Sequence, residues 1–396
     1  LSQNGICIYI HIPFCESKCH YCDFVSFPKK FKNLEEYFHC LIIELSLYRK
    51  KLSDYKVKTI FFGGGTPSAI DAKYISKVLD YIYGNFNTYD EIEISIEINP
   101  GTIDLDKLNI YKESGINRIS IGLQTLNNDI LRILGRIHNA EDFYQSYKMV
   151  QDVGFKSTNV DLIFDLPNQT LEKGMKDVEV LVDLGVKHIS YYSLIIEPGT
   201  LIDQWWQEDK LNLLDEDSER RLYHNVREYL RNQGYNHYEI SNFALDGYKC
   251  SHNMAYWRIK PYLGVGLNSH SNLFGKRFSN TPDLGIYIER LSKYESPIVE
   301  EEIIDKETEI SEFCIFGLRL IEGINKEEFK DRFKEDINHL YKESIEKHKS
   351  NGLLIDDDEY LRLSDRGLDL ANIVEIDFLP NKINYLLTNS RKNDSL

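Results

Sequence analysis

The stretch Glu91-Ile-Glu-Ile-Ser-Ile-Glu-Ile-Asn99 alternates polar and apolar residues without a break. Successive side chains of a β-strand point to opposite faces. The isoleucines therefore lie on one face, and the glutamates, Ser95 and Asn99 lie on the other. The pattern predicts a strand with one apolar and one polar face.

Similar strand patterns recur on both sides of this stretch, and helical patterns separate them. The further strand candidates are residues 6–12, 59–62, 118–124, 159–164, 188–194 and 235–240, and clear helical periodicity covers residues 34–48, 142–153 and 174–184. Alternation at this spacing is typical of βαβ units. Six or seven such units predict an α/β fold, a full or partial TIM-type barrel. A doubly wound open sheet is the architectural alternative.

The pattern changes after residue 275. Residues 276–304 are turn-rich and end in the acidic stretch 300–302, and helices return after that. A short strand before Asp356, an acidic turn, a second strand over residues 360–363 and a helix start at Ser364 resemble a β-wing. We expect a barrel domain over residues 1–275, a linker over 276–304 and a small winged-helix-like C-terminal domain over 305–385.

The charge balance excludes some classes of partner. The 396 residues include 47 Lys+Arg and 63 Asp+Glu, which gives a formal charge of −16. Such a surface repels phosphate backbones, so we expect no nucleic-acid partner. The chain has no uninterrupted apolar run of about 18 residues, so we expect no membrane span.

Seven cysteines, an odd number unevenly spread, make a poor disulfide framework and indicate a reducing compartment, the cytoplasm. Three of them crowd into Cys15-Glu-Ser-Lys-Cys19-His-Tyr-Cys22. Zinc sites usually use two separated pairs. Three thiolates can instead hold three irons of a [4Fe-4S] cluster and leave the fourth iron open to an exogenous ligand. A chance group of buried thiols is the alternative, and it is the simplest interpretation of Cys7, Cys40 and Cys314.

Several polar or glycine-rich segments fall near the carboxyl ends of predicted strands, where α/β barrels bind their ligands. They are the cysteine loop, the glycine turn after residue 62, Glu97, Gln124 and Asp161. This convergence predicts a ligand site at that end of the barrel.

The segment Tyr9-Ile-His-Ile-Pro-Phe-Cys15, together with the two cysteines that follow, resembles the signature of radical S-adenosylmethionine proteins. The resemblance implies a [4Fe-4S] cluster on Cys15, Cys19 and Cys22, with S-adenosylmethionine chelating its open iron. It also implies an electron donor, because an electron from the cluster cleaves the sulfonium and yields a 5′-deoxyadenosyl radical.

Over nearly its full length the chain resembles the oxygen-independent coproporphyrinogen dehydrogenase family. The matching stretches are Gly63-Gly-Gly-Thr-Pro67, Ser95-Ile-Glu-Ile-Asn-Pro100, Ser120-Ile-Gly-Leu-Gln124, Leu134-Gly-Arg136, Asp161-Leu-Ile-Phe-Asp-Leu-Pro167 and Tyr238-Glu-Ile-Ser-Asn-Phe-Ala244. The resemblance implies S-adenosylmethionine contacts at Tyr9, Tyr21, Gly64, Gly65, Thr66, Glu97, Gln124, Arg136, Asp161 and Ile195. Glycines let bare backbone approach a ligand, carboxylates suit an ammonium or a ribose hydroxyl, and an arginine can pair with the methionine carboxylate.

Two branches of this family differ at two places. The dehydrogenase branch has a fourth cysteine two residues past the triplet, where this chain has Phe24. The other branch, the HemW heme chaperones, carries a His-Asn-x-x-Tyr-Trp motif, which is complete here as His252-Asn253-Met-Ala-Tyr256-Trp257. The resemblance implies heme binding by His252, Tyr256 and Trp257. Imidazole is a good axial ligand for heme iron, and aromatic rings can cover a porphyrin face. Cys250 and, more weakly, His270 are alternative iron ligands.

We therefore expect a heme chaperone that binds heme and transfers it to a heme-requiring apo-protein, with a [4Fe-4S] cluster and exchangeable S-adenosylmethionine. No catalytic residue is assigned. The alternative is a radical S-adenosylmethionine enzyme of tetrapyrrole metabolism, either a coproporphyrinogen III dehydrogenase or a heme-degrading methylase. An RNA-modifying radical enzyme is disfavoured by the acidic charge. The oligomeric state stays open, with a homodimer as one option.

Overall fold

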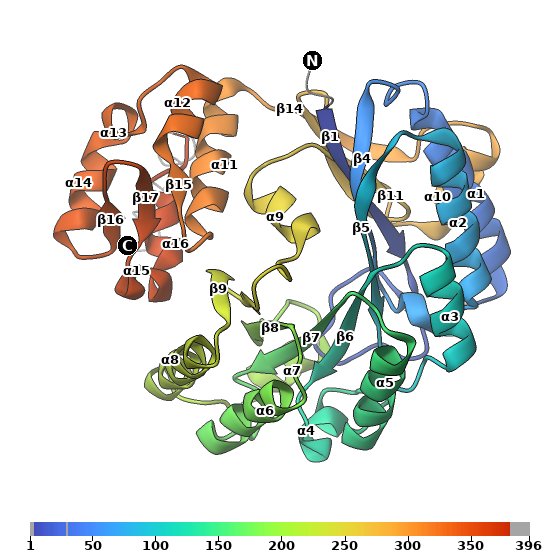
Figure 1. Cartoon of the computed structure of the whole chain (residues 1–396), viewed down its shortest axis with the longest axis horizontal. Helices are drawn as coiled ribbons and strands as arrows, with labels where there is room; N and C mark the ends of the chain where they lie inside the picture. Colours follow the sequence, from blue (N-terminus) through green and yellow to red (C-terminus); the bar gives the residue numbers. More distant parts are fainter. Residues whose placement is uncertain (1–3, 29–30, 381–396) are drawn as a thin grey trace. The chain divides into compact units, whose positions relative to one another are not determined.

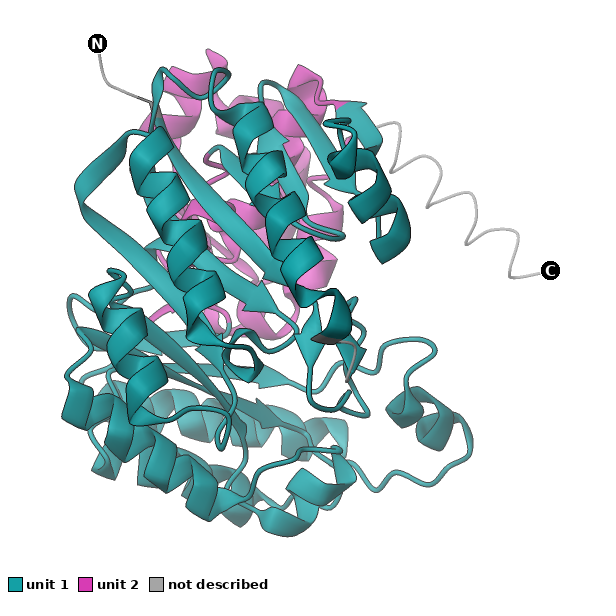
Figure 2. Cartoon of the chain, turned by 90° about the vertical axis from the view of Figure 1, so that its right-hand side faces the viewer, with its two compact units in different colours: residues 1–236, 241–252, 261–302 teal, residues 237–240, 253–260, 303–396 magenta. Residues whose placement is uncertain are grey.

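A computed structural model describes residues 4–28 and 31–380 of the chain. The chain divides into two compact units (Figure 2). Unit 1 comprises residues 1–236, 241–252 and 261–302, and unit 2 comprises residues 237–240, 253–260 and 303–396. Each unit is described by itself.

Unit 1 is built on six neighbouring parallel strands. In sheet order they are β1 (Asn4–Ile12), β4 (Tyr55–Gly64), β5 (Thr88–Ile98), β6 (Arg118–Gln124), β7 (Ser157–Phe164) and β8 (His188–Ser193). The main helices that follow these strands are α1 (Leu34–Tyr48), α2 (Ala72–Asn85), α3 (Leu105–Glu113), α5 (Ala140–Val153), α6 (Leu171–Asp183) and α8 (Glu216–Asn232), and they lie on the outer side of the curved sheet (Figure 1). The repeated βα unit confirms the expected α/β fold of partial-barrel type.

The alternation of polar and apolar residues over positions 91–99 explains the two faces of β5. Ile94, Ile96 and Ile98 are at most 2% exposed and belong to the same apolar core as residues of α2 and α3. The polar residues between them face the inner side of the curved sheet. This inner, polar face is the one that the site uses.

Shorter elements complete unit 1. These are β2 (Phe14–Cys15), β3 (Phe27–Pro28), η1 (Phe31–Asn33), η2 (Pro67–Ala69), α4 (Asn128–Ile133), α7 (Leu201–Gln207) and β10 (Asn242–Ala244), which pairs antiparallel with β8. Helix α9 (Ser251–Trp257) and strand β9 (Asn236–Glu239) contain residues of both units.

The other edge of the sheet extends beyond β1. Strand β11 (Tyr262–Val265) pairs parallel with β1, and β12 (His270–Leu273), β13 (Lys276–Asn280) and β14 (Ile298–Ile303) follow in the sheet order. Helix α10 (Leu284–Ser292) packs against α1.

Residues 276–304, expected to be a turn-rich linker, thus form β13, α10 and β14 instead. Phe278, Tyr287 and Leu291 anchor this segment in the core, whereas the acidic residues of β14 stay exposed. An exposed edge strand rich in glutamate lacks the alternating pattern that identifies a strand in a sequence, which is why the segment resembled a linker.

A buried carboxylate ties this edge to the rest of unit 1. Glu44 of α1 is fully buried and accepts hydrogen bonds from the Tyr287 hydroxyl at 2.6 Å, the Gly266 N–H at 2.8 Å and the Asn280 amide at 2.6 Å. Burial raises the pKa of Glu44 to about 7, although the three donors act in the opposite direction. One side chain therefore joins α1, α10, β13 and the turn after β11.

Unit 2 has a helical core closed by a small antiparallel sheet. Its helices are α11 (Lys306–Leu318), α12 (Lys326–Phe333), α13 (Ile337–Leu340), α14 (Lys342–Ser350), α15 (Asp365–Asp369) and α16 (Ala371–Ile376), and its strands lie in the order β15 (Ile324–Asn325), β17 (Tyr360–Leu363), β16 (Leu354–Asp356). The rings of Phe313, Phe329 and Phe333 pack with centroids 4.9, 5.4 and 5.9 Å apart. Helices with this wing confirm the winged-helix-like prediction. Residues 381–385 of the predicted domain lie outside the described residues.

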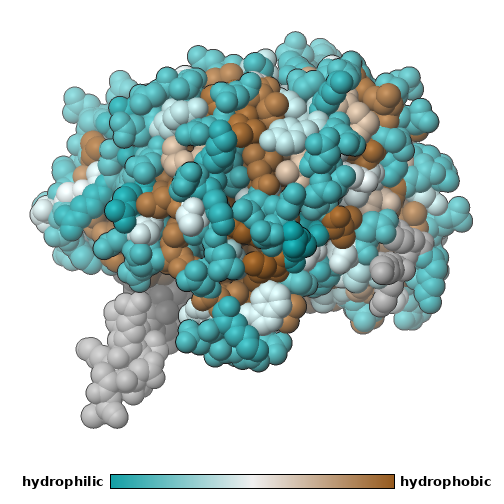
Figure 3. All heavy atoms as spheres, turned by 90° about the horizontal axis from the view of Figure 1, so that it is seen from below, coloured by the Kyte–Doolittle hydropathy of each residue, from teal (hydrophilic) through white to brown (hydrophobic). Residues whose placement is uncertain are grey.

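Within residues 4–28 and 31–380, no helix has both the length and the apolar composition of a bilayer-crossing segment. Figure 3 shows a face on which hydrophilic residues surround separate patches of apolar residues.

The Glu44 contacts predict a large effect of its removal. Glu44→Ala removes the acceptor of the buried Gly266 N–H and of the Tyr287 hydroxyl, and one of the acceptors of Asn280, so we expect a loss of about 3 kcal/mol in the free energy of unfolding, measured by chemical denaturation. Glu44→Gln, which keeps an acceptor oxygen, should lose clearly less. An unfolding free energy of Glu44→Ala equal to that of the wild type would contradict this role.

Candidate functional site

The cysteine loop, residues 13–28, leaves the carboxyl end of β1 and is fixed by the turn that ends β4. The Gly65 N–H donates to the Ile12 carbonyl at 2.8 Å, and the Thr66 N–H donates to the Phe14 carbonyl at 2.8 Å. A Cβ at Gly65 would lie 2.8 Å from both carbonyl oxygens and 3.0 Å from Cys15 Sγ. Only glycine allows the strand end to approach the loop this closely.

His11 holds the far side of the same loop. Its Nε2 lies 3.0 Å from the Val25 carbonyl, and its Nδ1 lies 3.1 Å from the Tyr9 hydroxyl. Burial lowers the pKa of His11 to about 4, so the ring is neutral at pH 7. Nε2–H therefore donates to Val25, and Nδ1 accepts from Tyr9. The sequence carries no signal for this role of His11, although the residue lies within the Tyr9–Cys15 segment.

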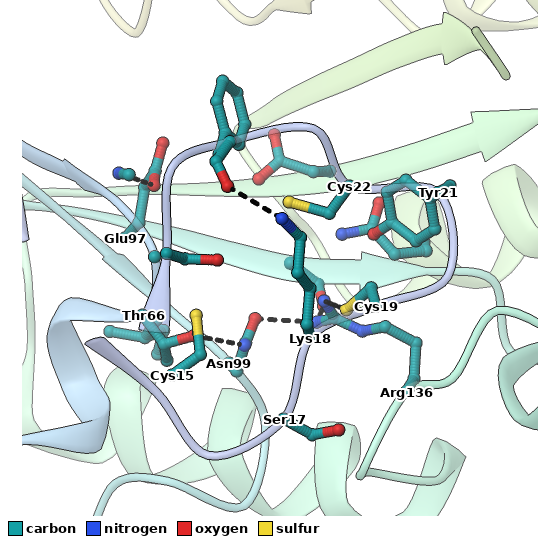
Figure 4. A pocket seen from close by; sticks show the side chains of 18 of the residues that line it. Cys15, Ser17, Lys18, Cys19, Tyr21, Cys22, Thr66, Glu97, Asn99 and Arg136 are labelled. Carbon is teal, nitrogen blue, oxygen red and sulfur yellow. Dashed lines mark hydrogen bonds between the residues drawn. The ribbon is translucent and has the colours of Figure 1, made fainter. Parts of the chain in front are cut away.

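One pocket at the carboxyl ends of the strands collects the three thiols and most of the predicted contact residues (Figure 4). Its lining includes Cys15, Cys19, Cys22, Tyr21, Gly64, Gly65, Thr66, Glu97, Gln124, Arg136 and Asp161. Two predicted residues are not part of the lining. Tyr9 hydrogen-bonds to His11 and stacks on Phe61, with ring centroids 6.3 Å apart, and Ile195 is 65% exposed beyond the end of β8.

The thiols have neighbours that suit a metal-bound sulfur. The Thr66 hydroxyl donates to Cys15 Sγ at 3.6 Å, and Arg136 Nη1 donates to Cys19 Sγ at 3.4 Å. Burial raises the pKa of Cys15, and it raises that of Cys22 to about 11. Hydrogen bonds of this kind stabilise thiolate ligands of iron–sulfur clusters.

The described residues contain no group of three His, Cys, Asp or Glu side chains that converges on a single metal ion. A four-iron cluster takes one thiolate per iron, and its ligands are therefore spread around it. Three thiols on one loop around a shared pocket fit such a cluster (Figure 4).

Arg136 organises the side of the pocket near Cys19. Its Nη2 donates to Asn99 Oδ1 at 2.7 Å and to the Gly122 carbonyl at 2.6 Å. Its Nε is buried and has no hydrogen-bond partner in the described chain. A buried guanidinium N–H without an acceptor is suited to a carboxylate of a ligand.

Two carboxylates, Glu97 and Asp161, face the same pocket from β5 and β7. Glu97 accepts from the Gly64 N–H at 3.2 Å, and Asp161 accepts from Ser120 Oγ at 3.0 Å and Asn159 Nδ2 at 2.7 Å. Burial raises the pKa of Glu97 to about 8, with the charge of Asp161 adding to the effect. Burial also raises the pKa of Asp161. A ligand that brings a positive charge or hydroxyl donors would relieve this strain.

The pocket lining also includes residues that the sequence did not identify as contacts, among them Lys18, Asn99, Ser120 and Tyr192. Asn99 donates to Thr66 Oγ1 at 3.0 Å and accepts from Arg136, so it bridges two predicted residues. It closes the polar alternation that begins at Glu91, and that parity could have identified it. Ser120 shares its strand face with Gln124. For Lys18 and Tyr192 the sequence carried no comparable signal.

Helix α9 carries the complete His-Asn-x-x-Tyr-Trp motif. His252 is 1% exposed, its Nδ1 shares a hydrogen bond of 2.7 Å with Thr59 Oγ1, and its ring lies against Phe61 with centroids 5.1 Å apart. Glu93 accepts from the Ser251 N–H at 3.0 Å and the His252 N–H at 2.9 Å. Burial lowers the pKa of His252 to about 3, which leaves its imidazole neutral.

The other motif residues and the alternative ligands differ in exposure. Tyr256 and Trp257 are half-buried, and the Trp257 ring lies 6.2 Å from that of Phe316. Cys250 is 2% exposed and lies 3.7 Å from a Glu93 oxygen, whereas His270 is exposed on β12.

Comparison with known families agrees with this geometry. Residues 9–181 match the model of the Radical SAM superfamily, and residues 304–370 match the HemN C-terminal domain. A solved structure of Escherichia coli coproporphyrinogen III oxidase, HemN, described as a radical SAM enzyme, superposes with a TM-score of 0.83 at 21% identity over 95% of this chain and 90% of that one. That likeness shows the fold. The fold and the sequence together define a protein of the radical SAM class.

Curated relatives narrow the class. The chain is 34% identical over 377 residues to the heme chaperone HemW of Lactococcus lactis. The aligned region covers 95% of this chain and 98% of the relative. It is 33% identical to the HemW of Bacillus subtilis, over 92% of this chain and 97% of the relative. The Escherichia coli HemW is 30% identical over 93% and 97%. The chain belongs to the HemW family of heme chaperones.

The placement of the thiols predicts which cysteines hold iron. Replacing Cys15, Cys19 or Cys22 with Ser should abolish iron and sulfide binding in anaerobically reconstituted protein, because each removes a thiolate at the pocket. The wild type should bind about four of each. Cys40→Ser is the matched control, since Cys40 is buried on α1, away from the pocket lining. Iron loss in Cys40→Ser together with retention in Cys22→Ser would show that the ligands are assigned wrongly.

The raised pKa of Glu97 predicts a pH dependence of stability. Between its ordinary value of 4.5 and about 8, Glu97 is ionised in the unfolded chain and protonated in the fold. The contribution of Glu97 to the free energy of unfolding is therefore complete below pH 4.5. It is lost as the pH rises toward 8, and the free energy of unfolding falls by up to about 1.4 kcal/mol per pH unit. Denaturation of ligand-free protein at pH 5, 6, 7 and 8 should show a shallower decline for Glu97→Gln. Identical slopes in both proteins would mean that Glu97 ionises normally.

Proposed function

We propose that this protein binds heme and passes it to a heme-requiring acceptor protein, on a scaffold that holds a [4Fe-4S] cluster and exchangeable S-adenosylmethionine. The observation that carries the proposal is the complete His-Asn-x-x-Tyr-Trp motif on α9, in a chain whose relatives over nearly their full length are heme chaperones.

In this proposal the pocket residues bind and orient the cofactors. Cys15, Cys19 and Cys22 would ligate three irons, and Arg136 would pair with the methionine carboxylate through its unpartnered Nε. When bound, the cluster supplies an electron that can cleave the sulfonium of S-adenosylmethionine. An electron donor is therefore a further expected partner.

The two carboxylates would hold the rest of S-adenosylmethionine. Glu97 and Asp161 accept hydrogen bonds from its amino group or ribose hydroxyls, and the bare backbone at Gly64 and Gly65 lets the ligand approach. Tyr21, Thr66 and Gln124 line the same space. Tyr9 acts indirectly, by orienting His11, and Ile195 would contact the ligand only from the exposed segment after β8.

Heme would bind at α9 with His252 as the axial ligand. Metal-ligating histidines donate their other ring N–H to an acceptor, which fixes the tautomer. Thr59 Oγ1, 2.7 Å from His252 Nδ1, could accept such a hydrogen bond, and Nε2 would then be the ligating nitrogen. Since the ring is 1% exposed, iron can reach it only after a local opening around α9. Tyr256 and Trp257 would then cover the porphyrin.

The alternative function is a radical S-adenosylmethionine enzyme acting on a tetrapyrrole. Phe24 argues against the coproporphyrinogen branch, because it is 60% exposed and lines the pocket at the position of that branch's fourth cysteine. A reducing, cytoplasmic location and a homodimer remain predictions of the sequence.

Heme binding can be tested at His252. His252→Leu removes the imidazole, the side chain of the motif that best suits iron. Loss of a residue that only hydrogen-bonds to a metal ligand costs roughly tenfold in affinity. Loss of the ligand itself should weaken heme binding by more than this. The Soret band should shift, and transfer to an apo-acceptor should fall. Iron and sulfide content should not change. His39→Leu, at an exposed histidine of α1 in the same unit, is the control.

An unaltered heme spectrum and normal transfer in His252→Leu would contradict the assignment of the ligand, and Cys250 would be tested next. If the wild type binds no heme and decarboxylates coproporphyrinogen in the presence of S-adenosylmethionine, the enzyme function replaces the chaperone function.

A further inference from the structure

Arg319, directly after α11 in unit 2, forms no ion pair among the residues that the structure describes. Its guanidinium carbon lies 4.7 Å from the centroid of the Trp257 ring. Within the described residues its side chain makes no hydrogen bond or ion pair, and its Nε is shielded from solvent without a partner. Three other arginines of unit 2 pair with carboxylates: Arg258 with Glu322 at 2.6 Å, Arg332 with Glu309 at 2.7 Å and Arg362 with Asp357 at 2.5 Å.

With its guanidinium carbon over the Trp257 ring, Arg319 can keep its N–H donors available to a ligand. A guanidinium that stacks on an aromatic ring uses its flat face, and its N–H groups lie at the edge, in its own plane. This edge matches a carboxylate, which it can bind through two parallel hydrogen bonds. Keeping such a group half-buried without an acceptor costs free energy, so its position indicates an anionic ligand.

Two neighbouring groups support this interpretation. Within residues 4–28 and 31–380, the Trp257 indole Nε1 is likewise shielded and has no hydrogen-bond partner. Glu375 Oε1 is also buried and unpartnered, and it forms no ion pair with Arg319 in the described chain. Burial raises the pKa of Glu375 despite the attraction of Arg319. The nearby Glu375 carboxyl therefore attracts the guanidinium but makes no direct hydrogen bond to it among the described residues.

We propose that Arg319 binds a propionate carboxylate of the heme, beside the Trp257 ring of the His-Asn-x-x-Tyr-Trp motif. This inference rests on the proposed function, since it assumes that heme binds at α9. Heme is apolar except at the edge that bears its two propionates, so a site made of aromatic rings needs a cation at that edge. Arg319 stacks directly on a ring of the motif, in a chain of formal charge −16.

The experiment compares two ligands on three proteins. Heme and heme dimethyl ester, which lacks both carboxylates, are titrated in the same detergent into wild type, Arg319→Gln and the control Arg366→Gln. Arg366 is an exposed arginine of unit 2 that donates to the Asn351 carbonyl at 3.4 Å. A charge-assisted hydrogen bond corresponds to about tenfold or more in affinity.

In the wild type and in Arg366→Gln, the affinity for heme should exceed the affinity for its dimethyl ester by about tenfold or more. In Arg319→Gln this preference should disappear, while the ester binds as it does to the wild type. Arg319→Lys keeps the positive charge but loses the two parallel N–H donors of the guanidinium, so it should retain part of the preference for heme over its ester. Circular dichroism and thermal unfolding confirm that each variant is folded.

The other outcomes separate the two proposals. If Arg319→Gln weakens heme and ester equally, Arg319 acts only by packing on Trp257, and the propionate contact is refuted while heme binding stands. An unchanged preference in Arg319→Gln also refutes the contact. If the wild type binds neither ligand, the proposed function itself fails.

Discussion

Two backbone hydrogen bonds, from the N–H groups of Gly65 and Thr66 to the carbonyls of Ile12 and Phe14, position the pocket. They are possible because β1 and β4 pair in parallel with Ile12 opposite Gly64, so both strands deliver their next residues to the same place. From there a chain of side-chain contacts follows. Thr66 contacts Cys15 and Asn99, Asn99 contacts Arg136, and Arg136 contacts Cys19. Two of the three thiols are thus held by one connected polar network that begins at a glycine turn.

The same inner face of the sheet carries an electrostatic conflict. Glu97 and Asp161 are buried and point into one pocket, where burial raises the pKa of both and the charge of Asp161 raises that of Glu97 further. Hydrogen bonds offset part of the cost of burying these carboxylates. Ser120 and Asn159 donate to Asp161, and the Gly64 N–H donates to Glu97. These donors orient the carboxylates without neutralising them. A pocket of this kind favours a ligand that carries positive charge over one that is neutral.

Much of this arrangement could be predicted from the sequence, because strand parity is a local property. The alternation around Glu97 identified β5 and its polar face, and β6 matches the predicted residues 118–124. The edge strands β11 to β14 could not be predicted in this way. They are short or exposed, and Glu44 stabilises this region through contacts more than 220 positions away in the chain. His11 was missed for a related reason: its role depends on the Val25 carbonyl, which only the folded loop brings near.

The motif on α9 shows what a sequence pattern leaves undetermined. The pattern named His252, Tyr256 and Trp257, but not that Thr59, Phe61 and Glu93 enclose the histidine or that Arg319 stacks on Trp257. Each contact comes from an element distant in sequence. Under the proposed function, a buried ligand has a consequence for affinity. When only an opened fraction of the molecules can bind, the apparent affinity falls by that fraction.

A protein that stores heme would lose by such a penalty, whereas one that gives heme away gains from it. Closing α9 restores the contacts of His252 with Phe61 and of its backbone with Glu93, and these contacts favour the heme-free state. Thr59 plays a different part, because its hydrogen bond to Nδ1 is compatible with iron on Nε2 and can persist in both states. Under the proposed function, the enclosure of His252 would therefore tune the release of heme, and Thr59 would hold the imidazole in the tautomer that can bind iron again.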